Sequence, residues 1–238
     1  FFLALGVRLC QGYGQTEAAP VVSCNRPLNI KIETVGPALK GVEVRLAPDG
    51  EILVRGELLM DGYWDDPEAT EKALIDGWLH TGDIGEIDAD GYIRITDRKR
   101  DIIVISGGDN ISPQRVEGFV TLQPEIGQAM VYGDKRPYLV GLIVPAPEFV
   151  ESYAKDKGVA PDLAALAGDK DFRAAIGAVL ERVNGGLSNL EKVRRFVVAT
   201  EPFTTDNQMM TPTLKIRRHN IRKEYQAVLD ALYEGKAG

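Results

Sequence analysis

Residues 77–117 have the sequence GWLHTGDIGEIDADGYIRITDRKRDIIVISGGDNISPQRVE, and the organisation of the whole chain follows from this stretch. At its centre, residues 97–101 (Asp-Arg-Lys-Arg-Asp) are all charged and of both signs, and a strand-like apolar segment lies on either side. A short charged segment between two such strands is typical of a connector between folded bodies. We therefore predict a hinge at residues 97–101, for which an ordinary charged loop is the alternative.

The charge balance changes sign at this connector. Residues 1–97 hold 8 Lys/Arg and 17 Asp/Glu, a net of −9, whereas residues 98–238 hold 20 and 18, a net of +2; together they give −7. An acidic body and a basic-leaning one suit a cleft that binds polyanionic ligands with a divalent metal. A chance difference in surface composition would look the same.

Length and composition set the class of protein. With 238 residues, of which 44% are apolar, the chain can bury a sizeable core and form two units. It begins with Phe1 in an apolar stretch, so we expect a piece of a longer protein. No apolar run approaches the roughly 20 residues of a membrane span, and no signal peptide is visible, which predicts a cytoplasmic location. With only two histidines, chemistry based on charge placement is favoured over a histidine base.

The first candidate site follows a predicted strand at residues 7–10. The sequence continues as QGYGQTE, in which Gly12 and Gly14 flank Tyr13 and allow the backbone to approach a ligand closely. Thr16 and Glu17 add a hydroxyl and a carboxylate just beyond the strand end, where open α/β sheets bind ligands. A plain turn with an exposed tyrosine is the alternative.

Residues 34–97 predict a small β unit. Two alternating segments, GVEVRLA and EILVRG, flank a Pro-Asp-Gly turn, and Asp66 followed by Pro67 is typical of a helix start. We also expect a loop over residues 77–83, which ends at Asp83 between glycine-rich neighbours, and a strand over residues 91–96. The acids between Glu86 and Asp97 have the spacing of a calcium loop, but their alternating flanks favour an acidic hairpin turn.

Residues 98–238 predict a body of the α+β class, with helices and strands gathered around one small sheet. The predicted strands are residues 100–106, 128–132, 138–144 and 195–200. One predicted helix begins after Ser112, and three others span residues 147–157, 169–183 and 220–233.

The segment TTDNQMMTPTLKIRR, residues 204–218, lies between the last predicted strand and the last helix. Pro212 restricts the backbone ahead of Lys215, a mobile point charge that can reach a phosphate oxygen. An ordinary solvated lysine is the alternative. The basic cluster of Arg217, Arg218, Arg222 and Lys223 has the charge of a weak nucleic-acid patch, but the acidic whole chain and the lack of interleaved aromatics argue against nucleic acid.

Four segments in this order, GYGQTE, GWLHTGD, DRKRDIIVISGGDNISPQRVE and TPTLKIRR, resemble the adenylate-forming superfamily. This superfamily includes acyl-CoA synthetases, firefly luciferase and peptide-synthetase adenylation domains. TPTLKIRR resembles the lysine loop of bacterial long-chain fatty-acid CoA ligases, whereas shorter-chain enzymes tend to have Gly before the Lys. The resemblance implies that residues 1–97 end the large adenylating domain, with a β-rich part from about residue 34, and that residues 98–238 are a mobile lid domain.

The resemblance also implies roles for the N-terminal residues. Tyr13, between Gly12 and Gly14, would stack on adenine. Thr16 would contact the α-phosphate of ATP, and Glu17 would hold Mg²⁺, an ion that prefers oxygen ligands.

Further roles concern the connector and the lid. Asp83 would accept hydrogen bonds from the ribose hydroxyls with help from Arg98, and Asp97 would be the pivot of the lid. Ser106, Gly107 and Gly108 would line the path of the CoA pantetheine. Lys215 would bridge the acyl carboxylate and the α-phosphate.

The implied reaction is ATP-dependent activation of a long-chain fatty acid to acyl-AMP, followed by transfer to CoA with release of AMP and pyrophosphate. The ionised carboxylate needs charge neutralisation and no general base. The resemblance allows peripheral contact with the inner face of a membrane and leaves the acyl chain length and oligomeric state open.

Two departures from the superfamily pattern matter. Arg100 replaces the usual Lys of the hinge segment, which leaves its role open, and the phosphate-gripping Ser/Thr/Gly loop is absent. We therefore expect this chain alone to be inactive. A fatty-acyl-AMP ligase, another adenylate-forming ligase such as a peptide-synthetase domain, and a non-catalytic nucleotide-binding module are the alternatives.

Overall fold

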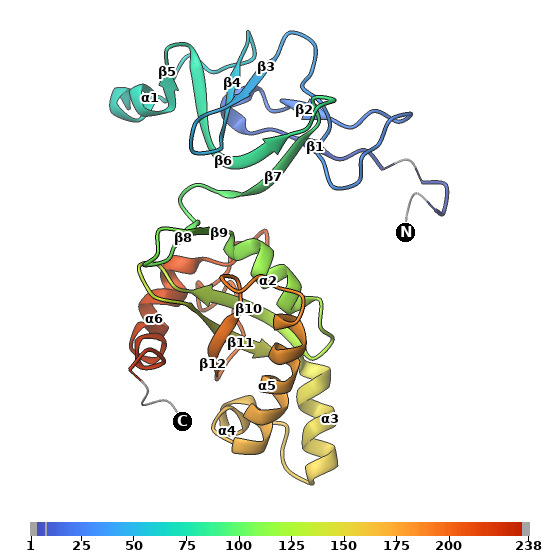
Figure 1. The fold of residues 1–238 in the computed structure, drawn as a ribbon, viewed down its shortest axis with the longest axis vertical. Coiled ribbons are helices and arrows are strands. Elements are labelled where there is room, and N and C mark those ends of the chain that lie inside the picture. The colour runs from blue at the N-terminus through green and yellow to red at the C-terminus, as the bar shows by residue number, and fades with distance from the viewer. Residues whose placement is uncertain (1–3, 8, 235–238) are drawn as a thin grey trace. The chain divides into compact units, whose positions relative to one another are not determined.

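The computed structural model describes residues 4–7 and 9–234, and the chain divides into two compact units (Figure 1). Unit 1 comprises residues 1–101 and unit 2 comprises residues 102–238. Unit 1 thus ends at Asp101, within the charged segment in which the sequence predicts a connector.

Unit 1 is built on a five-stranded sheet with the strand order β3-β4-β6-β5, in which β7 pairs with β6. These strands are β3 (Glu43–Leu46), β4 (Glu51–Arg55), β5 (Leu74–Ile75), β6 (Trp78–Ile87) and β7 (Ile93–Arg98). Before these strands in the chain, β1 (Gly12–Tyr13) and β2 (Ser23–Cys24) form a separate pair, with the short helix η1 (Thr16–Ala18) between them. Helix α1 (Pro67–Ala73) lies between β4 and β5. Ile52, Val54, Leu79 and Ile93 of the sheet form a buried cluster with Ala18 and Val22.

Most of the β unit agrees with the sequence prediction. β3 and β4 pair across the Pro-Asp-Gly turn, and the side chain of Asp66 accepts a hydrogen bond from the amide of Ala69 at the start of α1. The acids that resemble a calcium loop form the turn of the β6–β7 hairpin, where the Asp88 side chain accepts hydrogen bonds from the amides of Asp90 and Tyr92. The hairpin prediction is confirmed.

Two predictions in unit 1 are wrong. The predicted loop at residues 77–83 is the first half of β6, which pairs with β4 and β7 and buries Leu79. The polar residues of this segment give it no strand pattern, but strand partners on both sides stabilise it as a strand. The predicted strand at residues 7–10 is absent from the described residues Val7, Leu9 and Cys10; both apolar side chains are about half exposed, and no described strand pairs with them.

Unit 2 contains a three-stranded sheet in which β11 lies between β10 and β12. β11 (Leu139–Pro145) is antiparallel to β10 (Ile126–Tyr132) and parallel to β12 (Val193–Val198). A short hairpin of β8 (Ile103–Val104) and β9 (Asn110–Ile111) precedes the sheet. The helices are α2 (Pro113–Thr121), α3 (Pro147–Lys157), α4 (Leu163–Ala167), α5 (Lys170–Asn184) and α6 (Arg218–Ala231).

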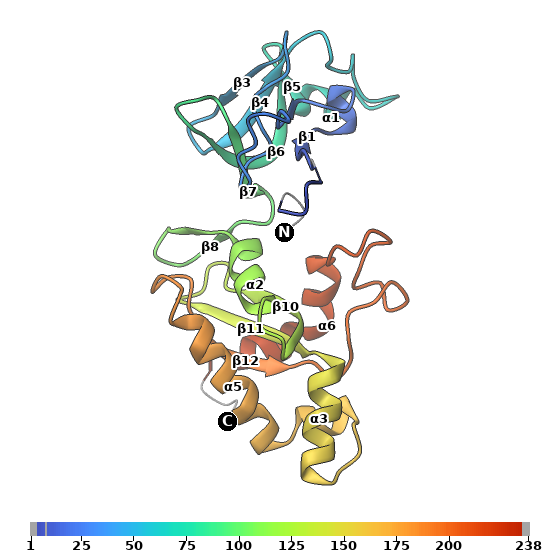
Figure 2. The same ribbon diagram turned by 90° about the vertical axis from the view of Figure 1, so that its right-hand side faces the viewer.

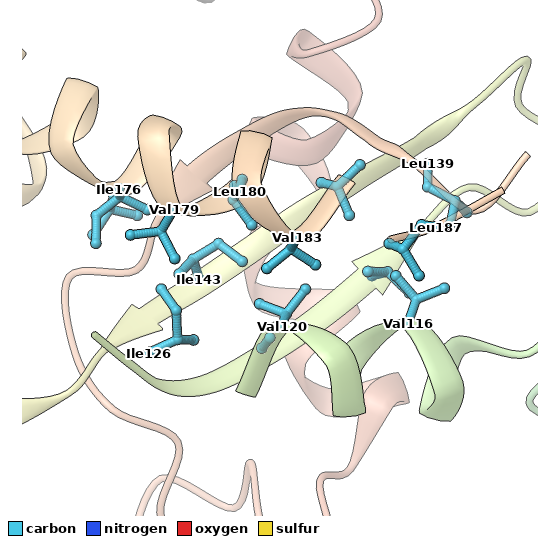
Figure 3. Packing of buried hydrophobic residues seen from close by; sticks show 14 of the residues in the cluster. Val116, Val120, Ile126, Leu139, Ile143, Ile176, Val179, Leu180, Val183 and Leu187 are labelled. Atoms are coloured by element: carbon cyan, nitrogen blue, oxygen red, sulfur yellow. The ribbon is translucent and has the colours of Figure 1, made fainter. Parts of the chain in front are cut away.

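The sheet of unit 2 buries both faces. Along β11, Leu139 and Ile143 point into one cluster and Val140 and Leu142 into the other, as strand alternation requires. The first cluster includes the apolar faces of α2 and α5, which meet over the sheet (Figure 3). The second includes Ile221 and Leu229 of α6, so α6 and α5 cover opposite faces of the sheet (Figure 2).

The helices of unit 2 follow the local signals in the sequence. Ser112 caps α2 by accepting from the amide of Arg115, Asp169 caps α5 by accepting from the amide of Phe172, and Gly158 ends α3 in the left-handed conformation. The predicted α+β class is confirmed. The strand expected at residues 100–106 is wrong in extent, since only Ile103–Val104 pairs, and α4 was not predicted. In the described part of the chain, no helix has the length and apolar character needed to cross a membrane.

Candidate functional site

Gly12 and Tyr13 form strand β1, and Gly14 follows it directly. β1 pairs with β2, so that Gly12 lies opposite Cys24 and Tyr13 opposite Ser23. A Cβ atom added to Gly14 would lie 1.7 Å from the carbonyl oxygen of Pro20, far inside van der Waals contact. Glycine at position 14 is therefore a steric requirement.

The side chain of Tyr13 contacts that of Asp83, which lies seventy positions further along the chain. Its hydroxyl donates to Oδ2 of Asp83 at 2.6 Å. Arg98 lies on the other side, with its Nε 3.4 Å from Oδ1 of Asp83, because the β6–β7 register pairs Asp83 with Arg98. We call these three residues the Tyr13–Asp83–Arg98 cluster.

The electrostatics of this cluster suit a hydrogen-bond acceptor. Burial and the hydrogen bond to Asp83 raise the pKa of Tyr13 well above its ordinary value, so the phenol remains a donor. Asp83 is 7% exposed, and its own amide donates to Oγ1 of Thr81 at 3.1 Å. The carboxylate is thus held in one orientation, with an aromatic ring on one side and a half-exposed guanidinium on the other.

Sequence reasoning missed a second network, centred on Glu51. Its Oε1 accepts from the amide of Gly82 at 2.9 Å, while its Oε2 lies 2.9 Å from Nζ of Lys99 and 3.0 Å from Nδ1 of His80. Burial by itself raises the pKa of Glu51, but the hydrogen bonds from Lys99, His80 and the Gly82 amide outweigh it and bring the pKa below its ordinary value. The only sequence signal was an acid at the start of a strand that is otherwise apolar.

The Glu51 network joins the residues on either side of the cluster. Gly82 precedes Asp83, and Lys99 follows Arg98. A backbone hydrogen bond also connects these two segments, since the amide of Lys99 donates to the carbonyl of Gly82 at 2.8 Å. The chain is therefore fastened to β6 as far as Lys99.

Thr16 and Glu17 lie on η1, which begins three residues after Tyr13. Tyr63, a further residue that the sequence did not indicate, donates its hydroxyl to Oε1 of Glu17 at 2.9 Å, and the amide of Met60 donates to the Glu17 carbonyl at 2.9 Å. The described residues contain no group of three or more His, Cys, Asp or Glu side chains placed to hold a metal. A single carboxylate is a fitting protein ligand for Mg²⁺, which is commonly held by one or two carboxylates together with substrate phosphates.

Asp97 is almost completely buried in β7. It is 2% exposed and pairs with Ile84 across the β6–β7 ladder. Its Oδ1 accepts from the amide of Arg98 at 2.6 Å, and its Oδ2 has no hydrogen-bond partner among the residues that the structure describes. The first connector residue whose amide makes no hydrogen bond within the described chain is Arg100.

Ser106, Gly107 and Gly108 form an exposed turn between β8 and β9. The amide of Gly108 donates to the carbonyl of Ile105 at 2.8 Å, and Gly108 has a φ of +89°, which favours glycine. The amide of Ser106 donates to the carbonyl of Arg136 at 2.9 Å and fastens the turn to the loop after β10. The turn presents backbone with little side-chain bulk on the surface of unit 2.

Lys215 lies on a small hairpin that a bridge between Met210 and Ile216 closes. The amide of Lys215 donates to Oγ1 of Thr211 at 3.0 Å, and its carbonyl accepts from the amide of Thr211 at 2.8 Å. Leu214 is 72% exposed and has a φ of +59°. This is the left-handed conformation, which glycine adopts without strain and a leucine does not. Within the described residues the Lys215 ammonium makes no ion pair.

The structure therefore brings some of the predicted residues into contact and places the others separately. Tyr13, Asp83 and Arg98 form one cluster in unit 1, with Thr16 and Glu17 on the next turn. Lys215 and the turn at Ser106, Gly107 and Gly108 belong to unit 2.

Comparison with known proteins assigns both units. The family model of AMP-binding enzymes matches residues 1–64, and that of the AMP-binding enzyme C-terminal domain matches residues 100–237. The chain belongs to the AMP-binding enzyme family. The resemblance to adenylate-forming enzymes is thereby confirmed.

Relatives of this AMP-binding enzyme include long-chain ligases. The long-chain-fatty-acid–CoA ligase FadD15 of Mycobacterium bovis is 37% identical over 98% of this chain and 39% of its own length. Human long-chain-fatty-acid–CoA ligase 6 is 34% identical over 97% of this chain and 35% of its own length. The chain thus spans well under half the length of these relatives.

A solved structure agrees with the fold. The A domain of a carboxylic acid reductase from Segniliparus rugosus, in complex with AMP and a co-purified carboxylic acid, matches with a TM-score of 0.79 and 26% identity. The match covers 99% of this AMP-binding enzyme and 37% of that chain.

The steric requirement at Gly14 predicts a stability change. Gly14→Ala should lower the free energy of unfolding of unit 1 by about 2 to 3 kcal/mol, the upper part of the range for overpacking. Both tryptophans, Trp64 and Trp78, lie in unit 1, so urea unfolding followed by tryptophan fluorescence reports on this unit.

Gly41→Ala is the matched control, because Gly41 has open space around the added Cβ but a φ of +84°. This change should cost only about 1 kcal/mol, from backbone strain. Equal losses in the two variants would contradict a steric role for Gly14.

Proposed function

We propose that the intact protein activates a long-chain fatty acid with ATP to give acyl-AMP and pyrophosphate, and then transfers the acyl group to CoA with release of AMP. The observation that carries this proposal is the Tyr13–Asp83–Arg98 cluster, in which a buried carboxylate is held beside an aromatic ring and a guanidinium. The long-chain ligase names of the relatives support the choice of substrates.

In the first half-reaction, unit 1 would bind the nucleotide. The ring of Tyr13 would stack on adenine, beside the small Gly12 and Gly14, and Asp83 would accept hydrogen bonds from the ribose hydroxyls. Asp83 is suited to this because Tyr13 and Arg98 already orient its two oxygens, which leaves little side-chain freedom to lose on binding. Thr16 would donate its hydroxyl to the α-phosphate.

The bond-forming step needs charge neutralisation. The ionised fatty-acid carboxylate attacks the α-phosphorus, an oxygen–phosphorus bond forms, and pyrophosphate leaves with the electron pair of the broken bond. Lys215 would bridge the attacking carboxylate and the α-phosphate, where its charge offsets the repulsion between two anions. Glu17 would hold Mg²⁺, which when bound neutralises phosphate charge, and Tyr63 would keep the Glu17 carboxylate in place.

In the second half-reaction, the CoA thiol displaces AMP from the acyl carbon to form the thioester. The turn at Ser106, Gly107 and Gly108 would line the pantetheine path, since its exposed backbone lets a narrow chain pass. Using one nucleotide site for two steps requires a change of the lid between them.

Asp97 was the expected pivot, but its surroundings favour a pivot further along. Rotation at Asp97 would break its pairing with Ile84. Rotation at Lys99 would break its contacts with Glu51 and Gly82. We therefore propose that the lid turns at residues 100–102, where these ties end.

The first prediction of this proposal concerns substrates. The intact protein with ATP, Mg²⁺ and CoA should form a thioester with palmitate faster than with octanoate or acetate, as measured by AMP release and mass spectrometry of the acyl-CoA. The 238-residue chain alone should form none. Acyl-AMP without thioester would indicate an acyl-AMP ligase instead, and nucleotide binding without turnover would indicate a non-catalytic module.

The second prediction concerns Lys215. In the intact protein, Lys215→Ala should lower acyl-AMP formation by about 100-fold or more, in the range for loss of a charge that stabilises the reacting phosphate. Thioester formation from supplied acyl-AMP and CoA should remain near the unmodified rate. Pyrophosphate exchange and a thioester assay separate the two steps, and a parallel loss in both would rule out the proposed role.

The third prediction concerns the pivot. Arg100→Pro should preserve acyl-AMP formation and suppress thioester formation, because proline fixes φ at a residue whose amide bonds to nothing in the described chain. Arg100→Ala, which keeps φ free, should preserve both steps. Full thioester formation by the proline variant would place the pivot elsewhere.

A further inference from the structure

Glu117 is a buried acid whose position on α2 brings it to the free edge of the sheet in unit 2. Its neighbours on α2, Val116 and Val120, face the core (Figure 3), and Glu117 itself is 8% exposed. Its Oε1 accepts from the amide of Val131 at 2.8 Å, an amide on the edge strand β10. An edge amide that would otherwise lack a strand partner is thus satisfied by a carboxylate.

Arg218 reaches the same carboxylate from the other face of the sheet. It is the first residue of α6, and its guanidinium forms a two-pronged pair with Glu117, in which Nη1 lies 2.6 Å from Oε1 and Nη2 donates to Oε2. The two side chains are 20% and 10% exposed. Because α2 and α6 cover opposite faces, this pair joins them around the edge of β10.

The segment that contains the Lys215 hairpin, residues 203–218, is linked to β10 at both of its ends, directly at Phe203 and through Glu117 at Arg218. At the start, the side-chain amide of Gln128 on β10 accepts from the amide of Phe203 at 2.7 Å and donates to its carbonyl at 2.9 Å. At the end, Arg218 follows Lys215 by three residues, and the amide of Arg217 donates to the carbonyl of Met209 at 2.7 Å. Between these attachments, Lys215 itself is exposed, and its hydrogen bonds to other described residues all involve its backbone.

We propose that Arg218 is a positioning residue for Lys215: its pairing with Glu117 sets where the lysine hairpin stands on unit 2, and so where the ammonium can reach. The inference rests on the proposed role of Lys215 in acyl-AMP formation. Lysine has a flexible side chain that makes no fixed fork, so its placement depends on the backbone that carries it. The planar guanidinium of Arg218, held by two parallel hydrogen bonds, supplies that fixed backbone position.

A purely structural ion pair would behave differently from a positioning one. Loss of general stability in unit 2 would impair every step that uses this unit, including thioester formation along the turn at Ser106, Gly107 and Gly108. Loss of hairpin position would impair the step that uses Lys215 and would spare the other. The ratio of the two half-reaction rates therefore separates the two roles.

The experiment uses the intact protein with the changes Arg218→Met, Arg218→Lys and Glu117→Gln. Arg115→Met is the matched control. Like Glu117, Arg115 lies on α2 and belongs to an ion pair, with Glu191 at 2.9 Å, and its side chain is 55% exposed. Its described hydrogen bonds involve Ser112 and Glu191 and not the segment that contains Lys215. Each variant is assayed for pyrophosphate exchange, for thioester formation from supplied acyl-AMP, and for melting temperature. Trypsin cleavage after Lys215, followed by mass spectrometry, reports on the hairpin without any activity.

We expect Arg218→Met to lower kcat of acyl-AMP formation on the order of 100-fold, as small displacements of a reacting group do, with little change in KM for ATP. Thioester formation should stay near the unmodified rate, cleavage after Lys215 should become faster, and Arg218→Lys should fall between. Arg115→Met should leave both half-reactions unchanged.

Equal loss of both half-reactions in the Arg218 variants, or no loss in either, would overturn the inference. Should Arg218→Met not fold, Arg218→Lys and Glu117→Gln decide the question by the same ratio. If Lys215→Ala itself shows no preference for one half-reaction, the proposed function fails first; if it does and the Arg218 variants do not, only the positioning role is lost.

Discussion

The register of β6 against β7 is the constraint on which the candidate site of unit 1 depends. This register pairs Asp83 with Arg98, and it leaves the Asp83 carboxylate where the Tyr13 hydroxyl can donate to it. Because side chains alternate along a strand, a slip of one residue would turn Asp83 to the other face and separate the three side chains. Three segments far apart in the sequence therefore act together through one strand pairing.

Buried charge is the second feature that organises unit 1. A carboxylate as enclosed as that of Glu51 is costly to bury unless it is paired and hydrogen-bonded, and here Lys99, His80 and the Gly82 amide supply those partners. The partners come from β6 and from the end of β7, so the pairing that satisfies the acid also fixes the chain on both sides of the Tyr13–Asp83–Arg98 cluster. Stability and site geometry share the same contacts.

Unit 2 uses the edge of a sheet in a comparable way. β10 has a free edge, and side chains from α2 and α6 meet there instead of another strand. The chain on either side of the lysine hairpin is linked to this strand, at Phe203 through Gln128 and at Arg218 through Glu117. A flexible side chain is thereby carried on a well-defined backbone, with Leu214 in a strained conformation next to it.

The sequence by itself determined the elements whose signals are local. Caps such as Asp66, Ser112 and Asp169, the glycine that ends α3, and the Pro-Asp-Gly turn each act within a few residues. The helices that carry these signals and the β3–β4 hairpin could therefore be predicted, whereas the short α4 was not. The order of the four family segments likewise identified the family and nominated Tyr13, Asp83 and Lys215.

Only the tertiary structure decided the rest. The first half of β6 contains polar residues and becomes a strand because β4 lies on one side of it and β5, followed by the end of β7, lies on the other. Residues 7–10 have the pattern of a strand, but the described residues among them have no described strand partner. The contacts of Asp83 with Tyr13, of Glu51 with Lys99, and of Glu117 with Arg218 join residues that are 48 to 101 positions apart. Such pairings depend on strand register and on which helix covers which face, and these are properties of the packed chain that no local pattern contains.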